Sequence, residues 1–392
     1  MATETLMIGV NLPFDCVILY TNQVYRSSGR ERLSRQSYRN FVGRAGRLGL
    51  AASGKSFLLV EADDAAEYRK KDGGENIVSA FVRENDNREM KIAPFYMTLV
   101  GGSFTTDDLD NLDSTSLSHS CGQHKLDVQM LLKYLVTYKM ADATKGMGLQ
   151  THYQVTKIGR ALAPYALSLE SACNLCTCFG APMSEEMEKK NGSKFLRSIS
   201  GAGDIRSDKY LPDILYIVCQ DQELEQSHNL DIGISEEKTK IQSSLLTALQ
   251  ELCDSGEVEL WEHSALRKDF LGHYPSLLDG DYTNLFRTLA MYYWVKGFTN
   301  QDIRERMHLQ KFSGTDETAA ALLSNGDLER FSEVLSFHIE AASRLPETYW
   351  LYYERKAEKG IPFARGLYNL SMRVKYGVPT DMLLLANRQV HG

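Results

Sequence analysis

Residues 41–56, FVGRAGRLGLAASGKS, constrain the fold most, because two phosphate-handling patterns follow one another there, one residue apart. GLAASGKS satisfies the P-loop formula G-x-x-x-x-G-K-S, but a P-loop needs a strand before the glycine-rich turn and a helix after it. Here SRQSYRNFVGRAGR before the turn has helix-forming residues, and SFLLVEA after it is a short apolar run typical of a strand. The sequence therefore predicts a helix-to-strand connection, with Lys55 as a surface lysine.

The other pattern, GRAGR, places Arg44 and Arg47 three residues apart, so that both lie on one helical face and can converge on one phosphate. Gly43 and Gly46 let the backbone approach closely. Residues 26–47 hold seven arginines and one acid, a local charge of +6. Such a run is either a phosphate-facing surface or an ordinary solvated face.

GRAGR does not stand alone, because TETLMIGVNLP (Thr3 to Pro13) and the strand-like CVILY precede it. Together, TETLMIGVNLP and YRNFVGRAGRLG resemble motifs V and VI of superfamily 2 helicases. They are most similar to the Ski-like branch, which includes repair helicases and RNA-exosome helicases. The resemblance implies that both motifs lie on the second RecA-like lobe.

The resemblance also implies roles for single residues. Motif V would contact the nucleic-acid backbone through Thr3, Thr5, Gly9 and Asn11. Motif VI would bind nucleotide through Asn40, Gly43, Arg44 and Arg47. Arg44 and Arg47 would be the catalytic arginine fingers, which reach the γ-phosphate of ATP held with Mg²⁺. Asn40 stands where the family usually has Gln, which changes the reach of the amide and puts its role in doubt.

The sequence contains no D-E-x-[HD] box and begins at motif V. We therefore expect the C-terminal part of a helicase, either a fragment or one half of a split system. By itself it would not hydrolyse ATP. Its partners would be the missing N-terminal helicase region, or a subunit that carries it, and nucleic acid, as a single strand or partial duplex of DNA or RNA.

The expected fold class is multidomain α/β plus α. Residues 1–65 would form part of the second RecA-like lobe, 78–165 a winged helix, 166–375 a helical ratchet domain, and 376–392 the start of a truncated helix-hairpin-helix. Within the lobe, residues 17–35 are either a β-hairpin, as in relatives that separate strands there, or an ordinary loop.

The winged-helix prediction rests on three helical stretches and one wing-like segment. The stretches are KIAPFYMTLVGG, TTDDLDNL and KLDVQMLLKYLVTYKMA, and HYQVTKIGRALA follows them. YQVTKIGRALA resembles the segment that closes the winged helix of Ski-like helicases. In that family the domain mainly braces the lobes, so we favour bracing over base readout.

Residues 166–375 have helical periodicity, interrupted near residue 201 and at a turn around Asp279 to Asp281. MYYWVKGFTNQDI and DLERFSEVLSFHIEAASRL are the clearest amphipathic helices. The second resembles the ratchet helix of the family, in which an Arg and a Trp seven residues apart contact successive bases. Arg330 and Phe337 have this spacing, with Phe in place of Trp. The alternative is that Phe337 belongs to the core and Arg330 is a solvated charge.

We predict no metal site. Cys173, Cys176 and Cys178 lie in an apolar helical stretch without a second ligand pair, and His119, Cys121 and His124 lie in a polar loop with irregular spacing. His338 and the tryptophans are interpreted as core or surface residues. Seven cysteines, an odd number, suit a reducing compartment.

Composition fits an ordinary globular chain of 392 residues, with 43% hydrophobic and 24% charged residues. The first residues do not resemble a signal peptide, and no run is apolar and long enough to span a membrane. We therefore expect a cytoplasmic protein, or a nuclear one in a eukaryote. A net charge of −7 argues only weakly against nucleic acid, because phosphate responds to local clusters.

The sequence thus favours the C-terminal region of an ATP-dependent nucleic-acid helicase. A non-catalytic, helicase-like clamp subunit is the alternative. A winged-helix regulator would leave motifs V and VI as coincidence. DNA and RNA substrates are not distinguished.

Overall fold

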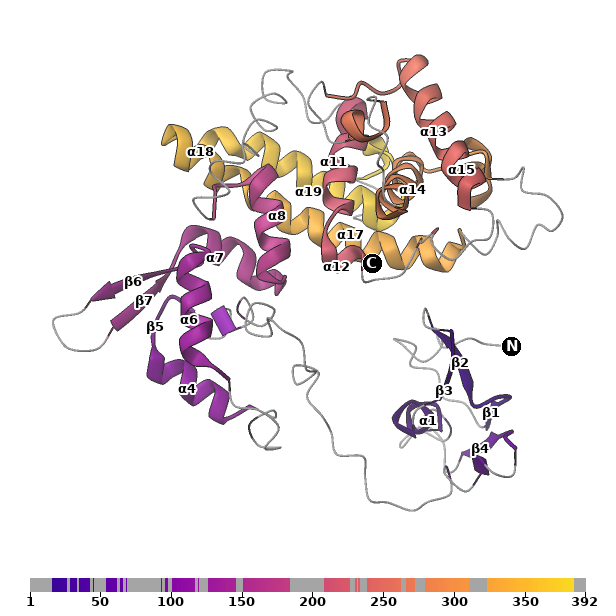
Figure 1. Cartoon of the computed structure of the whole chain (residues 1–392), viewed down its shortest axis with the longest axis horizontal. Coiled ribbons are helices and arrows are strands. Elements are labelled where there is room, and N and C mark those ends of the chain that lie inside the picture. Colours follow the sequence, from indigo (N-terminus) through magenta and orange to yellow (C-terminus); the bar gives the residue numbers. More distant parts are fainter. Residues whose placement is uncertain are drawn as a thin grey trace. The chain divides into compact units, whose positions relative to one another are not determined.

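The structure is a computed structural model of residues 1–392 (Figure 1). It describes residues 16–26, 29–33, 35–42, 45, 54–61, 64–65, 68, 93, 96–97, 101–116, 119, 126–145, 151–183, 208–225, 230, 232, 238–261, 266–271, 279–309 and 323–383. The chain forms two compact units, unit 1 (Met1–Val78) and unit 2 (Ser79–Gly392). The two units are described separately.

Unit 1 contains a parallel strand pair with a helix between the two strands in sequence. Strand β1 (Cys16–Leu19) pairs with β4 (Lys55–Leu58), with Cys16 opposite Lys55. Helix α1 (Arg35–Val42) lies between them in the chain, as a parallel pair requires a crossover connection. The sequence predicted a helix before GLAASGKS and a strand after it, and α1 and β4 confirm this order.

The β-hairpin alternative for residues 17–35 is confirmed. Strand β2 (Gln23–Arg26) pairs antiparallel with β3 (Gly29–Arg32). Asp64 fixes the base of this hairpin, because it accepts a hydrogen bond from Asn22 Nδ2 at 2.7 Å and forms an ion pair with Arg32 at 2.9 Å.

The first part of unit 2 combines short helices with a three-stranded antiparallel sheet of order β5-β7-β6 (Figure 1). The elements in chain order are β5 (Ser103–Thr105), α4 (Thr106–Ser114), α6 (Val128–Thr137), β6 (Ala141–Lys145), β7 (Thr151–Val155) and α7 (Lys157–Leu162). Helix α4 begins with a capping box between Thr105 and Asp108, as the TTDD sequence favours.

The predicted helix KLDVQMLLKYLVTYKMA is too long in both directions. Helix α6 covers only Val128–Thr137, because Asp127 caps its start and Lys139 adopts a left-handed conformation, φ 50°, after its end. The chain then enters β6, a strand that the sequence did not predict. HYQVTKIGRALA likewise divides into β7 and α7, with Thr156 as the N-cap of the helix.

The rest of unit 2 is helical. The helices are α8 (Leu169–Phe179), α11 (Leu211–Cys219), α12 (Gln222–Glu225), α13 (Lys238–Asp254), α14 (Asp279–Trp294), α15 (Asn300–Arg306), α17 (Asn325–Ser343), α18 (Pro346–Glu354) and α19 (Ile361–Tyr376). Shorter helical turns are η3 (Ala163–Tyr165), η4 (Asp208–Tyr210), η5 (Arg267–Leu271), η7 (Ala357–Gly360) and η8 (Thr380–Met382). Residues 384–392, most of the predicted helix-hairpin-helix start, lie outside the described residues, as does the predicted break near residue 201.

Two further sequence predictions about these helices are wrong. The turn expected at Asp279 to Asp281 is the first turn of α14, where acidic side chains suit the helix dipole. MYYWVKGFTNQDI is not one helix, because Gly297 has φ 81° and Thr299 starts α15 with its own capping box.

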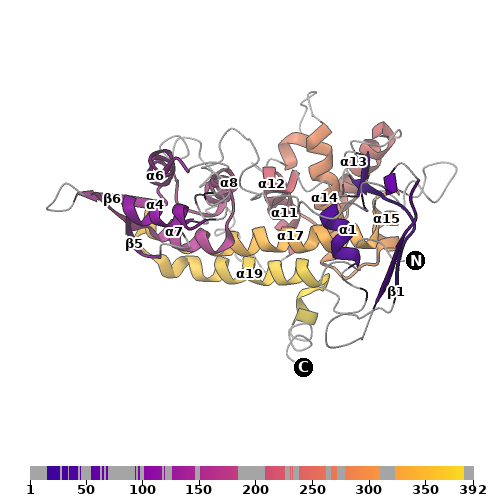
Figure 2. The same cartoon turned by 90° about the horizontal axis from the view of Figure 1, so that it is seen from below.

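The core of unit 2 lies around α11, α14 and α17. Nearly all of α11 is buried, and Leu285, Phe286 and Leu289 of α14 are fully buried. Helix α17 runs side by side with α19, as the two views of the molecule show (Figures 1 and 2). The backbone of α17 is therefore held along its length by a neighbouring helix.

Candidate nucleic-acid interface

Helix α17 is buried on most of its circumference and exposes one narrow stripe. Ser324 caps its start, since its hydroxyl accepts a hydrogen bond from the Asp327 amide at 3.1 Å. Leu328, Phe331, Leu335 and Ile339 are fully buried. The stripe, hereafter the α17 stripe, consists of Arg330, Glu333, Phe337, Glu340 and Arg344, of which Glu340 is half-buried.

The α17 stripe brings together the two residues predicted on this helix. Seven residues separate Arg330 from Phe337 and Phe337 from Arg344, which places all three on one face at steps of about 10.5 Å along the axis. Phe337 is 41% exposed, as Tyr368 also is, and the rest of its side chain is packed. Its contact with nucleic acid stays a prediction.

Arg330 is held only loosely. Its Nε donates to the carbonyl of Gly326 at 3.0 Å, and an Nη lies 3.5 Å from the Asp327 carboxylate. The arginine side chain is 60% exposed. An exposed pair of this kind contributes little free energy, so the guanidinium can exchange it for a phosphate or a base at small cost.

Tyr165 connects the C-terminal half of the α17 stripe to the first part of unit 2. Its ring contacts Phe337 edge to face, with centroids 5.2 Å apart. Its hydroxyl donates to Glu340 Oε1 at 3.2 Å and accepts from Arg344 Nε at 3.0 Å. Burial raises the pKa of Tyr165, so the hydroxyl stays protonated at neutral pH and keeps both bonds. This contact orients Phe337, whose side chain stays 41% exposed.

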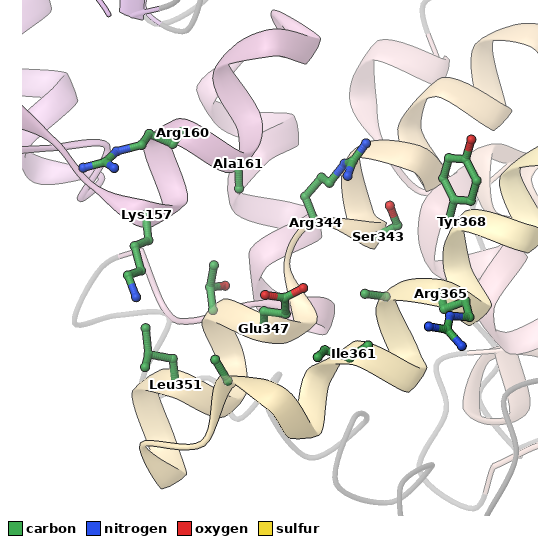
Figure 3. Close-up of a pocket in the computed structure, with 13 residues that line it drawn as sticks. Lys157, Arg160, Ala161, Ser343, Arg344, Glu347, Leu351, Ile361, Arg365 and Tyr368 are labelled. Carbon is green, nitrogen blue, oxygen red and sulfur yellow. The ribbon is translucent and has the colours of Figure 1, made fainter. Parts of the chain in front are cut away.

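A basic cavity of about 510 Å³ adjoins the end of the α17 stripe (Figure 3). Helix α7 contributes Lys157 and Arg160, α17 contributes Arg344, and α19 contributes Arg365. Glu347 of α18 lies between the basic groups of α7 and those of α17 and α19 (Figure 3). Two of these cations are engaged elsewhere, because Arg160 donates to the Val155 carbonyl at 3.3 Å and Arg344 pairs with Tyr165 and Glu340. Lys157 and Arg365 beside Glu347 leave a small surplus of positive charge that favours an anion such as phosphate.

The stripe and the cavity differ in what they can bind. The α17 stripe carries two arginines and two glutamates around an exposed aromatic ring, so its net charge gives phosphate little attraction. An aromatic face with flanking guanidinium groups suits the stacking of bases. The cavity has the surplus of positive charge that backbone phosphates require. Together, the stripe and the cavity can contact both the bases and the backbone phosphates of a single strand.

The other predicted site residues cannot be placed in the same way. Thr3, Thr5, Gly9, Asn11, Gly43, Arg44 and Arg47 lie outside the described residues. Asn40 belongs to α1, and only its backbone is described.

The three cysteines of α8 are free thiols. Burial raises the pKa of Cys173 and Cys178 to about 12 and that of Cys176 well above its ordinary value, so without a metal they stay protonated at neutral pH. In the polar loop, His119 lies 3.5 Å from Asp113, and Cys121 and His124 lie outside the described residues.

Sequence reasoning missed Tyr165, Arg344 and the basic cavity. A signal for Arg344 was available, because it continues the seven-residue step from Arg330 to Phe337. No comparable signal existed for Tyr165, which lies 179 residues before Arg344. In the part of the chain that the structure describes, no helix combines the length and apolar character needed to cross a bilayer.

Comparison with known proteins finds partial similarity to two helicases, and no family model matches the chain. A segment of 134 residues, 33% of this chain, is 30% identical to the ATP-dependent DNA helicase Hel308 of Pyrobaculum calidifontis. A segment of 62 residues, 16% of this chain, is 44% identical to the Helicase POLQ-like protein of Drosophila melanogaster. The matched segments span 19% and 6% of these two relatives. The chain thus contains a helicase-related region.

Proposed function

We propose that this chain supplies the part of an ATP-dependent nucleic-acid helicase that runs from motif V to the ratchet helix, within the Ski-like branch of superfamily 2. Unit 1 would carry motifs V and VI of the second RecA-like lobe. The order of β5, α4, α6, β6 and β7 supports a winged helix that braces the assembly, and α17 would be the ratchet helix.

The observation that carries this proposal is the exposed ring of Phe337 on the α17 stripe. The ring is 41% exposed and is held edge to face by Tyr165, so a contact within the chain orients it while part of it stays accessible to a base. Base stacking on an aromatic side chain contributes about 1–3 kcal/mol per base and tolerates any sequence. That tolerance is what a translocating protein needs.

Arg330 and Arg344 lie one seven-residue step before and after Phe337. We propose that Arg330 contacts a neighbouring nucleotide, and that the basic cavity holds the backbone phosphates beyond Phe337. A strand that follows the α17 stripe would then meet a guanidinium, a stacking ring and a cationic cavity in succession.

In motif VI, Arg44 and Arg47 would stabilise the charge that develops on the γ-phosphate of ATP. The ATP and its Mg²⁺ would be held between this chain and an ATP-binding lobe. Asn40 and Gly43 would border the nucleotide. Thr3, Thr5, Gly9 and Asn11 would contact the backbone of the nucleic acid. The chemistry of a planar, permanently charged guanidinium supports this role.

The test is the binding of a fluorescent single-stranded oligonucleotide to the purified chain. Phe337→Ala should weaken binding roughly 5- to 150-fold, the equivalent of one lost stacking contact. Its melting temperature should stay nearly unchanged because the ring is partly exposed. Tyr352→Ala removes an aromatic ring of similar exposure, 37%, that does not belong to the α17 stripe, and should bind normally.

In an ATPase-competent protein that contains this chain, Phe337→Ala should also uncouple unwinding from ATP hydrolysis. Early unfolding of the variant, or normal affinity and unwinding, would show that Phe337 serves packing and would refute the ratchet assignment.

A further inference from the structure

Three potential ligand residues from two distant parts of unit 2 meet beside the ratchet helix. Asp221 follows α11, Glu223 lies in α12, and His338 lies in α17 next to Phe337. One donor atom from each residue lies within 4.8 Å of the donor atoms of the other two. Among the described residues, this is the group of His, Cys, Asp and Glu side chains arranged closely enough to hold a metal ion.

Asp221 is 1% exposed, and its two carboxylate oxygens differ in their contacts. Oδ1 accepts hydrogen bonds from Ser171 Oγ at 2.6 Å and from the Glu223 amide at 2.9 Å. Oδ2 is buried and has no hydrogen-bond partner. A buried carboxylate oxygen without a partner is costly, because its hydration is lost and nothing replaces it.

His338 is 3% exposed and has the orientation of a metal-binding imidazole. Its Nδ1 lies 3.0 Å from the carbonyl of Val334, so a proton on Nδ1 is donated to the backbone. This contact fixes the tautomer and leaves the lone pair of Nε2 available, as is usual for histidines that bind metals. Nε2 makes no hydrogen bond and is buried.

Nε2 of His338 faces both carboxylates. It lies 3.5 Å from Glu223 Oε2 and 3.8 Å from Asp221 Oδ1. The ligand atoms of a tetrahedral zinc site with bonds of about 2.0–2.1 Å lie about 3.3 Å apart, so small side-chain shifts would suffice. The other oxygen of Glu223, Oε1, accepts from the Ser168 amide at 2.7 Å and fixes the carboxylate.

The charge of the cluster also favours a cation. Two carboxylates from α11–α12 face one imidazole nitrogen, at 3.5 Å and 3.8 Å, so the donor atoms carry a surplus of negative charge. One imidazole nitrogen and two carboxylate oxygens are a donor set that suits Zn²⁺ and excludes a preference for Mg²⁺.

We infer that Asp221, Glu223 and His338 supply three ligands of a binding site for one zinc-like divalent ion, with the fourth position left to water, which ties α12 to α17 at the residue next to Phe337. The site does not need ATP, and its link to the nucleic-acid interface rests on the proposed function. It assigns to the buried face of α17 a role in holding the exposed ring in position.

The experiment uses the full chain, freed of metal with a chelator and titrated with ZnCl₂ in a calorimeter. One Zn²⁺ should bind per chain, and excess Mg²⁺ should not displace it. Glu223→Gln keeps the hydrogen bond to the Ser168 amide but removes the charge, and should weaken Zn²⁺ binding at least about tenfold. His308→Ala breaks a two-residue pair with Glu251 at 2.8 Å that has no third ligand, and should bind Zn²⁺ normally.

Two further measurements keep the inference open to refutation. Zn²⁺ should raise the melting temperature of the wild-type chain and of His308→Ala, but not that of Glu223→Gln. Co²⁺ should give the weak visible bands of a nitrogen and oxygen site, without the strong near-ultraviolet absorption of thiolate ligands. Thiolate absorption, unchanged affinity in Glu223→Gln, or the absence of binding would overturn the proposal; the last result would mean that a protonated His338 balances the carboxylates.

Discussion

The candidate functional residues of units 1 and 2 are distributed along the sequence in opposite ways. In unit 1 the candidate residues belong to two short motifs, each contained in about a dozen consecutive positions. In unit 2 the α17 stripe and the basic cavity need residues from four helices and a turn, with Tyr165 and Arg344 separated by 179 positions. Residues that belong to a short motif can be found in a sequence. Residues that are brought together from distant helices can be found only once the packing of those helices is known.

The largest expected effect concerns unit 1. In an ATPase-competent protein that contains this chain, Arg47→Ala should lower kcat by about 10³-fold or more, because an arginine finger stabilises the charge of the transition state. Affinity for nucleic acid should be largely kept. The measurement is steady-state ATP hydrolysis with saturating nucleic acid.

Lys55→Ala is the matched control in the same unit. Lys55 is the first residue of β4, where a strand and not a helix follows the glycine-rich turn. The variant should hydrolyse ATP normally, and the isolated chain should not hydrolyse ATP at all. Turnover by the isolated chain that is lost in Lys55→Ala would make GLAASGKS a working P-loop and reverse our interpretation of unit 1.

The next effect compares thiols in the two units. Cys16 of unit 1 is exposed, whereas burial raises the pKa of Cys173 and Cys178 in unit 2 to about 12. An alkylating reagent at pH 7 should therefore modify Cys16 quickly and the α8 cysteines only on unfolding. Raising the pH to 9 should leave the α8 thiols unreactive, since they remain protonated below their pKa.

Peptide mass spectrometry over time measures this difference, with Cys16→Ser as the control. Rapid modification of Cys173 or Cys178 in the folded chain would show that α8 opens, and would weaken the description of unit 2 as tightly packed.

The stability of unit 2 should depend on a close approach at Gly159. A Cβ at this position would lie 2.2 Å from the Met140 carbonyl oxygen, so Gly159→Ala must push α7 away from the start of β6. We expect a loss of about 1–3 kcal/mol in the free energy of unfolding, measured by urea denaturation. Gly102→Ala, where the nearest atom is 3.9 Å away, should be nearly neutral. Equal stability of the two variants would contradict the packing of α7.

The smallest effect concerns the basic cavity. Arg365→Ala should weaken single-strand binding a few-fold. It should also reduce the magnitude of the slope of log affinity against log salt concentration by about one, as the loss of one phosphate contact does. Lys375→Ala removes a charge from the same helix outside the cavity and should leave the slope unchanged. If both variants change the slope equally, the cavity has no special role and the charge of α19 acts diffusely.

Local order was the part of the fold that sequence predicted well. The helix-to-strand order around residues 42–55 and the helix at TTDDLDNL were both predicted, and both follow from interactions within a few residues. The β2–β3 hairpin was one of two alternatives that the sequence left open. The errors occur where the same hydrophobic pattern continues across a break. Lys139 and Gly297 interrupt apolar runs because each has a left-handed backbone conformation. The spacing of hydrophobic residues contains no information about the backbone angles of a single residue, so it did not reveal these two breaks.

The sequence by itself determined that DLERFSEVLSFHIEAASRL is an amphipathic helix and that Arg330 and Phe337, seven residues apart, share one of its faces. Tertiary structure alone decided that this face is exposed, that Tyr165 contacts it, and that His338 on the buried side meets Asp221. The reason is physical. Caps and periodicity depend on neighbours three or four positions away, whereas burial and side-chain partners depend on which distant helices pack together.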